Sequence, residues 1–152
     1  MSGSSQSTKY IDDFDLETAP GHLLRRNHQR SYEIFADLVG TDVTRQQIAL
    51  LIALAKNPGA SQNDMVALTG FDKSTLREML GRLVEKGWVA RERDPDDSRA
   101  WRIDITPLGR ALLDEKMKRV KEVQNEIMAP LPSELRPVFL SCLQIMLGMK
   151  KA

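Results

Sequence analysis

Two short amphipathic segments joined by a glycine turn, at residues 61–87, constrain the fold more than any other feature of this sequence. Ser61 and Asp64 form a capping pair that opens a short helix, and Gly70 suits the left-handed residue that closes one. Asp72 caps a second helix, whose apolar residues recur at the spacing of one buried face. These residues are Leu76, Met79, Leu80, Leu83 and Val84. Two short helices joined by a tight turn with glycine are typical of a helix-turn-helix.

The hydrophobic period changes from that of a helix to that of a strand after Gly87. Residues 88–93 and 100–105 are expected to form two short strands. Between them, residues 94–99 have the sequence Asp-Pro-Asp-Asp-Ser-Arg, a polar cluster typical of a turn. The sequence therefore predicts a β-hairpin, a wing, directly after the helix-turn-helix.

Further helices are expected on both sides of this core. A capping box of Thr44 and Gln47 opens a helix that is apolar throughout its centre and therefore belongs in the core. Thr106 caps another helix, with Pro107 at its first position, where the missing N–H is tolerated. These flanking helices are expected at residues 21–39, 45–56 and 107–128 and, after Pro130 and Pro132, up to residue 149.

Residues 72–109 carry a resemblance to a known family. They contain Ser/Thr-Leu at the start of the second helix, Leu-x-x-x-Gly-aromatic at its end, Asp-x-Arg at the hairpin tip and Thr-x-x-Gly before the next helix. This pattern is similar to the signature of the MarR family, and the flanking helices extend the resemblance to about residues 21–149. One departure is Ser98, where many members carry a basic residue, and it concerns the charge of the wing and not the fold.

The resemblance implies a bacterial transcriptional regulator that binds a DNA pseudo-palindrome as a homodimer, in particular a ligand-releasable repressor of a catabolic, efflux or stress operon. The fold class is mainly α with a small β-hairpin wing (α+β). We expect one domain at 18–150, with the winged DNA-binding part at 44–106 and dimerisation helices at 18–40 and 107–150. Residues 1–17 begin with a polar, Ser-rich stretch and are expected to be a disordered tail.

The second helix of the helix-turn-helix turns polar residues outward once its leucines are buried, and we expect it to contact DNA. An α-helix fits the major groove, where arginine pairs with guanine and hydroxyl groups donate or accept. The alternative is a solvated helix with ordinary surface charge. The candidate residues are Lys73, Ser74, Thr75, Arg77 and Arg82.

Four arginines cluster in the wing: Arg91, Arg93, Arg99 and Arg102. Arginine at a hairpin tip suits a narrow A·T-rich minor groove, and Arg91 is a further candidate contact. By resemblance, Arg99 enters this groove and Asp97 orients it. The alternative is that the neighbouring aspartates only neutralise the arginines.

Four polar residues at helix starts are candidates for contacts with DNA phosphates, because helix N-termini attract anions. As helix caps they also have a purely structural interpretation. These residues are Thr44, Gln46, Ser61 and Gln62.

The first helix and the last two are too apolar to remain solvated around so small a core, so we expect a homodimer. An intramolecular helical bundle is the alternative. No run of residues approaches the length of a membrane span, and the N-terminal residues lack the features of a signal peptide. With Cys142 as the single cysteine, a cytoplasmic protein without membrane partners is expected.

An enzyme is not expected, because the sequence has no nucleotide-binding, metalloprotease or nucleophile-elbow motif. His22 and His28 lie on different faces of a helix and do not form a metal site, so no cofactor or metal is expected. A formal net charge of only +1 excludes a polybasic binder. A winged helix used only for protein contacts remains as a rival.

A basic cluster in the first helix suggests a small-molecule effector, an aromatic acid or an aromatic acyl-CoA, because guanidinium groups bind carboxylates and an aromatic wall suits a planar ring. The candidates are Arg25, Arg26, Arg30, Tyr32 and Phe35. The alternatives are that these arginines are solvated or pair with the acidic residues of the tail. A constitutive regulator without ligand, or a cysteine-based redox sensor, are the alternative functions, and Cys142 is expected to be buried among apolar neighbours.

Overall fold

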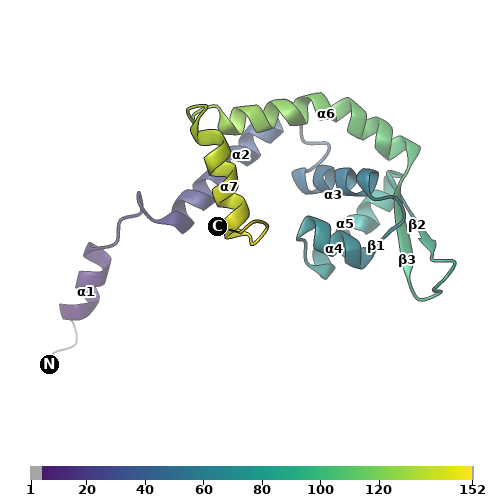
Figure 1. Ribbon diagram of the computed structural model, residues 1–152, viewed down its shortest axis with the longest axis horizontal. Coiled ribbons are helices and arrows are strands. Elements are labelled where there is room, and N and C mark those ends of the chain that lie inside the picture. Colours follow the sequence, from purple (N-terminus) through teal and green to yellow (C-terminus); the bar gives the residue numbers. More distant parts are fainter. Residues whose placement is uncertain (1–4, 152) are drawn as a thin grey trace. The chain divides into compact units, whose positions relative to one another are not determined.

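The computed structural model describes residues 5–151, which form two compact units (Figure 1). The winged unit comprises residues 38–124. The arm unit comprises the described parts of residues 1–37 and 125–152, and each unit is described by itself. The fold is mainly α-helical with one small antiparallel sheet, which confirms the predicted fold class.

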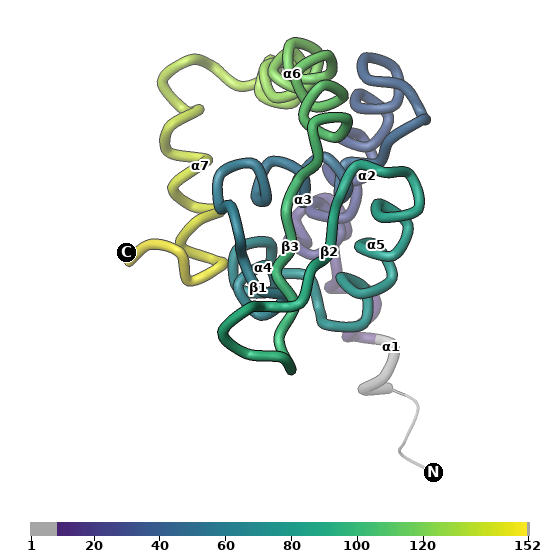
Figure 2. The backbone as a smooth tube through the Cα atoms, turned by 90° about the vertical axis from the view of Figure 1, so that its right-hand side faces the viewer, coloured from purple at the N-terminus to yellow at the C-terminus, as the bar shows by residue number. Residues whose placement is uncertain are grey.

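The winged unit contains a helical core and a three-stranded sheet with the strand order β1-β3-β2 (Figure 2). Its elements are α3 (Arg45–Lys56), β1 (Ala60–Ser61), α4 (Gln62–Thr69), α5 (Lys73–Glu85), β2 (Val89–Arg93), β3 (Trp101–Ile105) and most of α6 (Pro107–Met128). β2 and β3 form the antiparallel hairpin, in which Val89 faces Ile105 and Arg93 faces Trp101. The predicted helix-turn-helix and wing are thereby confirmed.

Fully buried side chains from α3, α4, α5 and β3 make the core of the winged unit. Leu51 of α3, Met65 of α4, Leu80 of α5 and Ile103 of β3 are at most 1% exposed. Leu76 and Leu83 are also buried, so α5 turns one face into the core and the opposite face outward. Val84, which the period places on the buried face, is instead 38% exposed because it lies at the edge of this face.

Side-chain caps fix the two helices of the helix-turn-helix. Ser61 and Asp64 make the predicted capping box of α4, and Gly70 closes that helix in the left-handed conformation, with φ of 71°. Asp72 caps α5 by accepting the N–H of Thr75 at 2.9 Å. Hydrogen bonds from Ser61 to Asp64 and from Thr75 to Asp72 hold the pKa of both carboxyls below the usual value.

A close contact at the start of α6 joins α5, the wing and α6. The Thr106 hydroxyl donates to the carbonyl of Gly87 at 2.6 Å and accepts the N–H of Gly109 at 3.1 Å. The Thr106 N–H donates to the carbonyl of Trp88 at 3.0 Å. A Cβ atom on Gly109 would lie 2.1 Å from that carbonyl oxygen, so only glycine fits there. The Thr-x-x-Gly pattern in the sequence therefore encodes this junction.

Lys116 of α6 holds the segment between α2 (Pro20–Val39) and α3. Its Nζ donates to the carbonyl of Val39 at 3.2 Å and forms an ion pair with Asp42 at 3.0 Å. The Lys116 side chain is 15% exposed, whereas that of Asp42 is 58% exposed. The hydrogen bond from Lys116 is the main reason why the pKa of Asp42 lies below the usual value.

The arm unit is helical and exposes many apolar side chains. It contains α1 (Ser5–Asp12), most of α2, the end of α6 and α7 (Leu135–Met146), with Pro137 in the first turn of α7 as predicted. α7 has no buried residue, and Val138, Leu140 and Met146 are each more than half exposed. No described helix is long and apolar enough to span a membrane.

The structure differs from the sequence-based expectations at several places. β1 was not expected, and it forms because Ala60 and Ser61 pair with Ile103 and Arg102 of β3. The last helix ends at Met146, three residues earlier than expected, near Gly148 with φ of 69°. Cys142 is exposed on α7, a helix in which no residue is fully buried.

The N-terminal tail also differs from the expected disorder in its described part. Residues 5–12 form α1, a helix of eight residues, while residues 1–4 lie outside the described residues. No glycine or proline interrupts residues 5–12, which permits the helix. Tyr10 and Ile11 at its end are more than 70% exposed.

We predict that Gly109→Ala destabilises the protein by about 1–3 kcal/mol, because the new methyl group displaces either α6 or the Trp88 carbonyl. Gly81→Ala is the matched control, since a Cβ at Gly81 meets nothing within 4 Å and alanine favours the helix by roughly 0.5–1 kcal/mol. Urea denaturation of the two variants measures both effects. Equal stability of the two variants would show that the junction tolerates a side chain.

We predict that Asp42→Asn lowers stability at pH 7, and that the difference from the natural protein disappears in acid. A carboxyl whose pKa is lowered in the folded state stabilises above its unfolded pKa of about 3.9, and this contribution is lost as pH falls through the folded pKa. Because Asp42 is largely exposed, the difference at pH 7 should be below about 1 kcal/mol. Denaturation at pH 7 and pH 3 measures it, and in a Lys116→Met background the effect of Asp42→Asn should be smaller, because Lys116 is the largest cause of the lowered pKa.

Candidate nucleic-acid interface

The outward face of α5 carries the predicted recognition residues. Lys73, Ser74 and Arg77 are exposed, and no hydrogen bond or ion pair within residues 5–151 engages their side chains. Thr75 is exposed, but its hydroxyl donates to Asp72 at 2.6 Å, so it can only accept from a further partner. Arg82 forms an ion pair with Glu78 one turn away. Lys73, Ser74 and Arg77 are therefore the most available for contact with DNA.

The loop of the wing, residues 94–100, projects beyond the ends of α4 and α5 (Figure 2). Its tip is fixed by its own backbone: the Ala100 N–H donates to the Asp97 carbonyl and the Asp94 N–H to the Ala100 carbonyl, each at 3.0 Å. The Asp97 carboxylate accepts the backbone N–H of Arg99 at 2.9 Å. Asp97 thus contacts the backbone of Arg99, and the exposed Arg99 guanidinium is directed outward without a carboxylate partner among the described residues.

Arg91 occupies a different environment from Arg99. Its guanidinium lies over the Trp101 ring, with Cζ 4.7 Å from the ring centre, and Arg93 lies over the same ring at 4.1 Å. Arg91 is half-buried, and its Nε is buried without a hydrogen-bond partner in the described part of the chain. This contact within the hairpin makes Arg91 a weaker candidate for DNA contact than Arg99.

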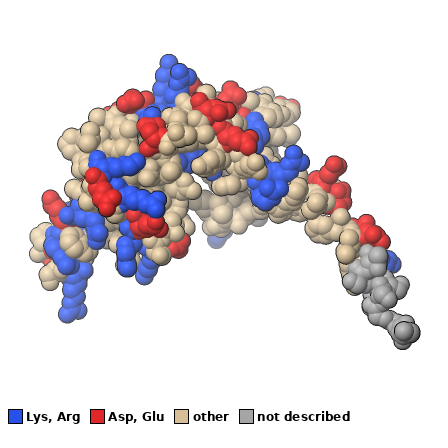
Figure 3. All heavy atoms as spheres, turned by 180° about the vertical axis from the view of Figure 1, so that it is seen from behind, with Lys and Arg blue, Asp and Glu red and all other residues tan. Residues whose placement is uncertain are grey.

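One shallow hollow brings together α4, α5 and the wing. Three cationic side chains, Lys73 and Arg77 of α5 and Arg99 of the wing loop, line it together with Trp101. The start of α4 contributes the rest of the lining, which includes two predicted phosphate contacts, Ser61 and Gln62. In the view from behind, Lys and Arg side chains gather over the wing end of the winged unit, at the lower left (Figure 3). The hollow is therefore a concave, positively charged surface suited to a polyanion.

The other two predicted phosphate contacts lie at the start of α3. Thr44 and Gln46 line a second hollow, together with Thr75 and Arg82 of α5. The Thr44 hydroxyl oxygen accepts the N–H of Gln47 at 3.1 Å, so it acts as a helix cap. Ser61 has the same role in α4, where its hydroxyl oxygen accepts the N–H of Asp64 at 3.1 Å. Both helix starts flank α5 and carry the positive end of a helix dipole.

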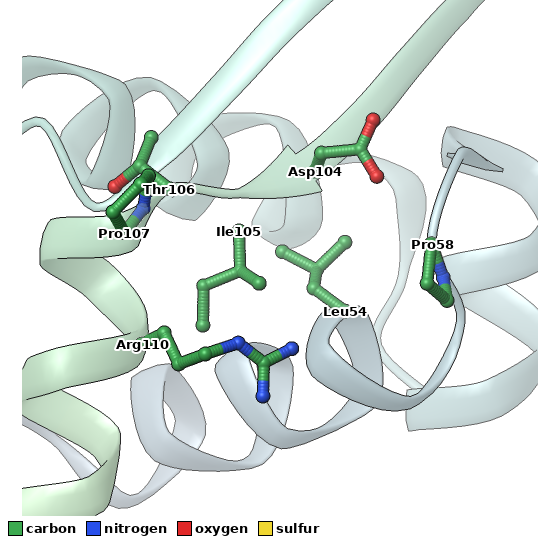
Figure 4. A pocket seen from close by; sticks show the side chains of 7 residues that line it. All are labelled: Leu54, Pro58, Asp104, Ile105, Thr106, Pro107 and Arg110. Carbon is green, nitrogen blue, oxygen red and sulfur yellow. The ribbon is translucent and has the colours of Figure 1, made fainter.

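A third hollow, shown in Figure 4, lies between the end of α3, β3 and the start of α6. Its two charged residues already have partners: Arg110 donates to the carbonyl of Ala55 at 3.3 Å, and Asp104 accepts the N–H of Gly59 at 2.6 Å. These contacts hold the α3 end and the β1 turn, which gives the hollow a structural role.

The predicted effector residues on α2 do not form one cluster. Arg26 and Arg30 share a face with Leu23 and Asn27 and line a shallow hollow in the arm unit. Arg30 donates to the carbonyls of Glu126 at 3.0 Å and Ile127 at 3.1 Å, so it caps the end of α6. The remaining candidates lie elsewhere, with Arg25 and Tyr32 at exposed positions and Phe35 only 6% exposed.

Sequence reasoning did not identify Trp101 and Lys116 as positioning residues. A tryptophan opposite alternating arginines was a possible signal for the first, because aromatic rings attract guanidinium groups across a hairpin. Nothing in the sequence pattern distinguishes Lys116 from the other lysines of α6.

Comparison with known proteins identifies relatives that are DNA-binding regulators, in agreement with the positively charged surface described above. A family model described as the MarR family matches residues 41–100. The HTH-type transcriptional repressor NicR of Pseudomonas putida is 30% identical over 135 residues, which cover 88% of this chain and 85% of NicR.

Two solved structures have the same fold over nearly their whole length. The PcaV transcriptional regulator of Streptomyces coelicolor, in complex with its natural ligand, is 31% identical with a TM-score of 0.85, covering 89% of this chain and 96% of PcaV. BpsR of Bordetella bronchiseptica, described for the regulation of its DNA binding by 6-hydroxynicotinic acid, is 32% identical with a TM-score of 0.77. That match covers 83% of this chain and 96% of BpsR.

We predict that Arg77→Ala weakens binding to a specific duplex by about 1–3 kcal/mol and relaxes the base preference at one position, because Arg77 is exposed on α5 and unpaired. Arg119→Ala on α6, whose arginine is paired with Glu122, is the control and should bind as the natural protein does. Fluorescence anisotropy with specific and random duplexes measures the effect. An equal loss on both duplexes would assign Arg77 to the phosphate backbone.

We predict that Arg99→Ala also lowers DNA affinity and makes its dependence on salt shallower by about one unit in the log–log slope. The reason is that the Arg99 guanidinium is exposed at the wing tip, where it can enter a minor groove. A titration over a salt range of about 50 to 300 mM, which includes the physiological ionic strength, measures the slope. Affinity and slope equal to those of the natural protein would exclude a DNA contact by the wing.

Proposed function

This chain belongs to the MarR family of transcriptional regulators, and we propose that it binds a pseudo-palindromic DNA site as a homodimer and releases that site when an aromatic acid binds. The observation that carries the DNA-binding part is the convergence of Lys73, Arg77 and Arg99 on one concave surface. They come from a capped helix and from a hairpin loop held by backbone hydrogen bonds, so the backbone that carries them is held in place without DNA. Preorganised cations of this kind favour binding to a duplex.

The two parts of this surface suit the two grooves of DNA. α5 exposes a hydroxyl and a guanidinium at Ser74 and Arg77, groups that form hydrogen bonds with base edges in the major groove. Arg99, on a loop that projects beyond α5, suits a narrow minor groove next to it. The starts of α3 and α4 lie on either side and supply contacts with phosphates.

A homodimer follows from the apolar surface of the arm unit. This unit exposes Leu24 on α2, Val138, Leu140 and Met146 on α7, and Leu147 directly after it, each at 46% or more. A monomer rarely exposes so many apolar side chains, and two-fold pairing is the commonest way to cover them. A dimer places two copies of α5 on half-sites whose centres are about 34 Å apart.

The proposed effector is an aromatic acid that binds in the arm unit. NicR is a repressor, BpsR is regulated by 6-hydroxynicotinic acid, and PcaV has a natural ligand. In this chain Arg26 is the best anchor for a carboxylate, because Arg30 on the same face already caps the end of α6. Among the described residues no ion pair joins Arg25 or Arg26 to the acidic residues of the tail.

Selection of duplexes from a randomised library tests DNA binding. The proposal expects an enriched pseudo-palindrome, bound by a dimer as measured by sedimentation of the complex. Recovery of random sequences only, or of a single half-site bound by a monomer, would contradict it.

A screen of melting temperature against aromatic acids and their CoA thioesters tests the effector. A binder at 100 times its Kd should add about 2.7 kcal/mol of stability and release the selected duplex. Arg26→Ala should weaken its binding, whereas Arg25→Ala, at an exposed position on another face of α2, is the control. Stabilisation by no anionic compound would favour a constitutive regulator.

A further inference from the structure

The first residue of β3, Trp101, lies under two guanidinium groups of the neighbouring strand. The Cζ atoms of Arg93 and Arg91 are 4.1 Å and 4.7 Å from the centre of its ring. Arg93 pairs with Trp101 across the hairpin, and Arg91 is two residues away on the same face of β2. Both distances are within the range of a cation–π interaction, for which tryptophan is the best ring.

The wing carboxylates do not take this role. Asp94 accepts the N–H of Asp96 at 2.8 Å, and Asp97 accepts the N–H of Arg99 at 2.9 Å. Within residues 5–151 the ion pairs lie elsewhere, and none joins a wing aspartate to an arginine. The aspartates therefore shape the loop, and the aromatic ring holds the arginines.

A direct link leads from Trp101 to the tip of the wing. Arg93, which lies over the ring, donates from Nη1 to the carbonyl of Ser98 at 2.9 Å. Ser98 directly precedes Arg99, whose own N–H is held by Asp97. The peptide unit before Arg99 is thus held at its carbonyl, through the guanidinium that Trp101 positions, and at its N–H, and the next N–H, that of Ala100, donates to the Asp97 carbonyl at 3.0 Å. Trp101 also lines the hollow that contains Arg77 and Arg99.

We propose that Trp101 is a positioning residue for the wing: it holds Arg91 and Arg93 within the hairpin and, through the bond from Arg93 to Ser98, presents Arg99 to DNA. Four like charges lie close together in this hairpin, and the ring keeps two of them from competing with Arg99. The proposal rests on the proposed DNA binding, and it assigns different roles to arginines that the sequence alone does not distinguish.

Trp101→Leu and Trp101→Phe are the matched pair that tests the cation–π contact. Leucine retains apolar volume without a ring, and phenylalanine retains a ring, while neither changes the charge of the wing. On the best duplex from the selection, we expect Trp101→Leu to bind about fivefold more weakly and Trp101→Phe to bind within about twofold of the natural protein. Equal weakening by both variants would overturn the proposal.

The same substitution in an Arg99→Ala background tests whether Trp101 acts through Arg99. We expect Trp101→Leu to have no further effect there, since the residue that it positions is absent. If the two losses of affinity multiply, Trp101 contacts DNA itself or acts by another route, and the proposal is wrong. Arg93→Lys, which keeps the charge, is expected to behave like Trp101→Leu and serves if the leucine variant does not fold. Binding of Arg93→Lys equal to that of the natural protein would contradict the link to Ser98.

Amide hydrogen exchange in the free protein separates this inference from DNA binding. The N–H groups of Asp94 and Ala100 are hydrogen-bonded within the loop, and we expect Trp101→Leu to raise their exchange rates severalfold while Trp101→Phe does not. Unchanged exchange in Trp101→Leu would overturn the positioning role. A natural protein that selects no duplex but shows this difference would refute the proposed function and leave the positioning of the loop supported.

Discussion

The geometry of the winged unit depends on the close approach of Gly109 to the Trp88 carbonyl. α5, the hairpin and α6 meet at this point, and Thr106 joins them through hydrogen bonds to Gly87, Trp88 and Gly109. The contact is possible only without a side chain at residue 109. Because the hairpin is fixed here to the helices before and after it, the direction in which the wing leaves the core is determined. The convergence of the wing with α5 follows from that direction.

A chain with a formal net charge of +1 presents a positive surface because the acidic residues near that surface form hydrogen bonds within the chain. Asp64 completes the capping box of α4 and Asp72 caps α5, and hydrogen bonds from Ser61 and Thr75 hold the pKa of the respective carboxyls below the usual value. In the wing, Asp97 binds a backbone N–H. Carboxylates next to the interface are therefore engaged with the chain, and the neighbouring cations remain exposed. Placement of charge, and not its total, produces the surface.

The sequence was sufficient for the helices from α2 onward and for the hairpin, because caps and apolar period act within a few residues. The helix starts are recognisable at Ser61, Asp72 and Thr106, because each side chain accepts a hydrogen bond from the backbone N–H three residues later. β1 was not predictable, because two residues carry no period and the strand exists only through Ile103 and Arg102. The different roles of the wing arginines depend on cross-strand register. Likewise, the exposure of Cys142 depends on whether another surface covers α7, which its apolar neighbours in the sequence do not reveal.

The N-terminal cap of α5 restricts the hydrogen bonds that Thr75 can form with a further partner. The hydroxyl hydrogen of Thr75 is committed to the Asp72 carboxylate, and this hydrogen bond is the main reason why the pKa of Asp72 lies below its usual value. Toward a ligand, Thr75 therefore offers only lone pairs, although a free hydroxyl can act either way. In the major groove, the amino groups of adenine and cytosine are the donors, whereas guanine and thymine present acceptors. In the proposed contact with DNA, this cap would therefore make Thr75 favour adenine or cytosine at the position that it faces.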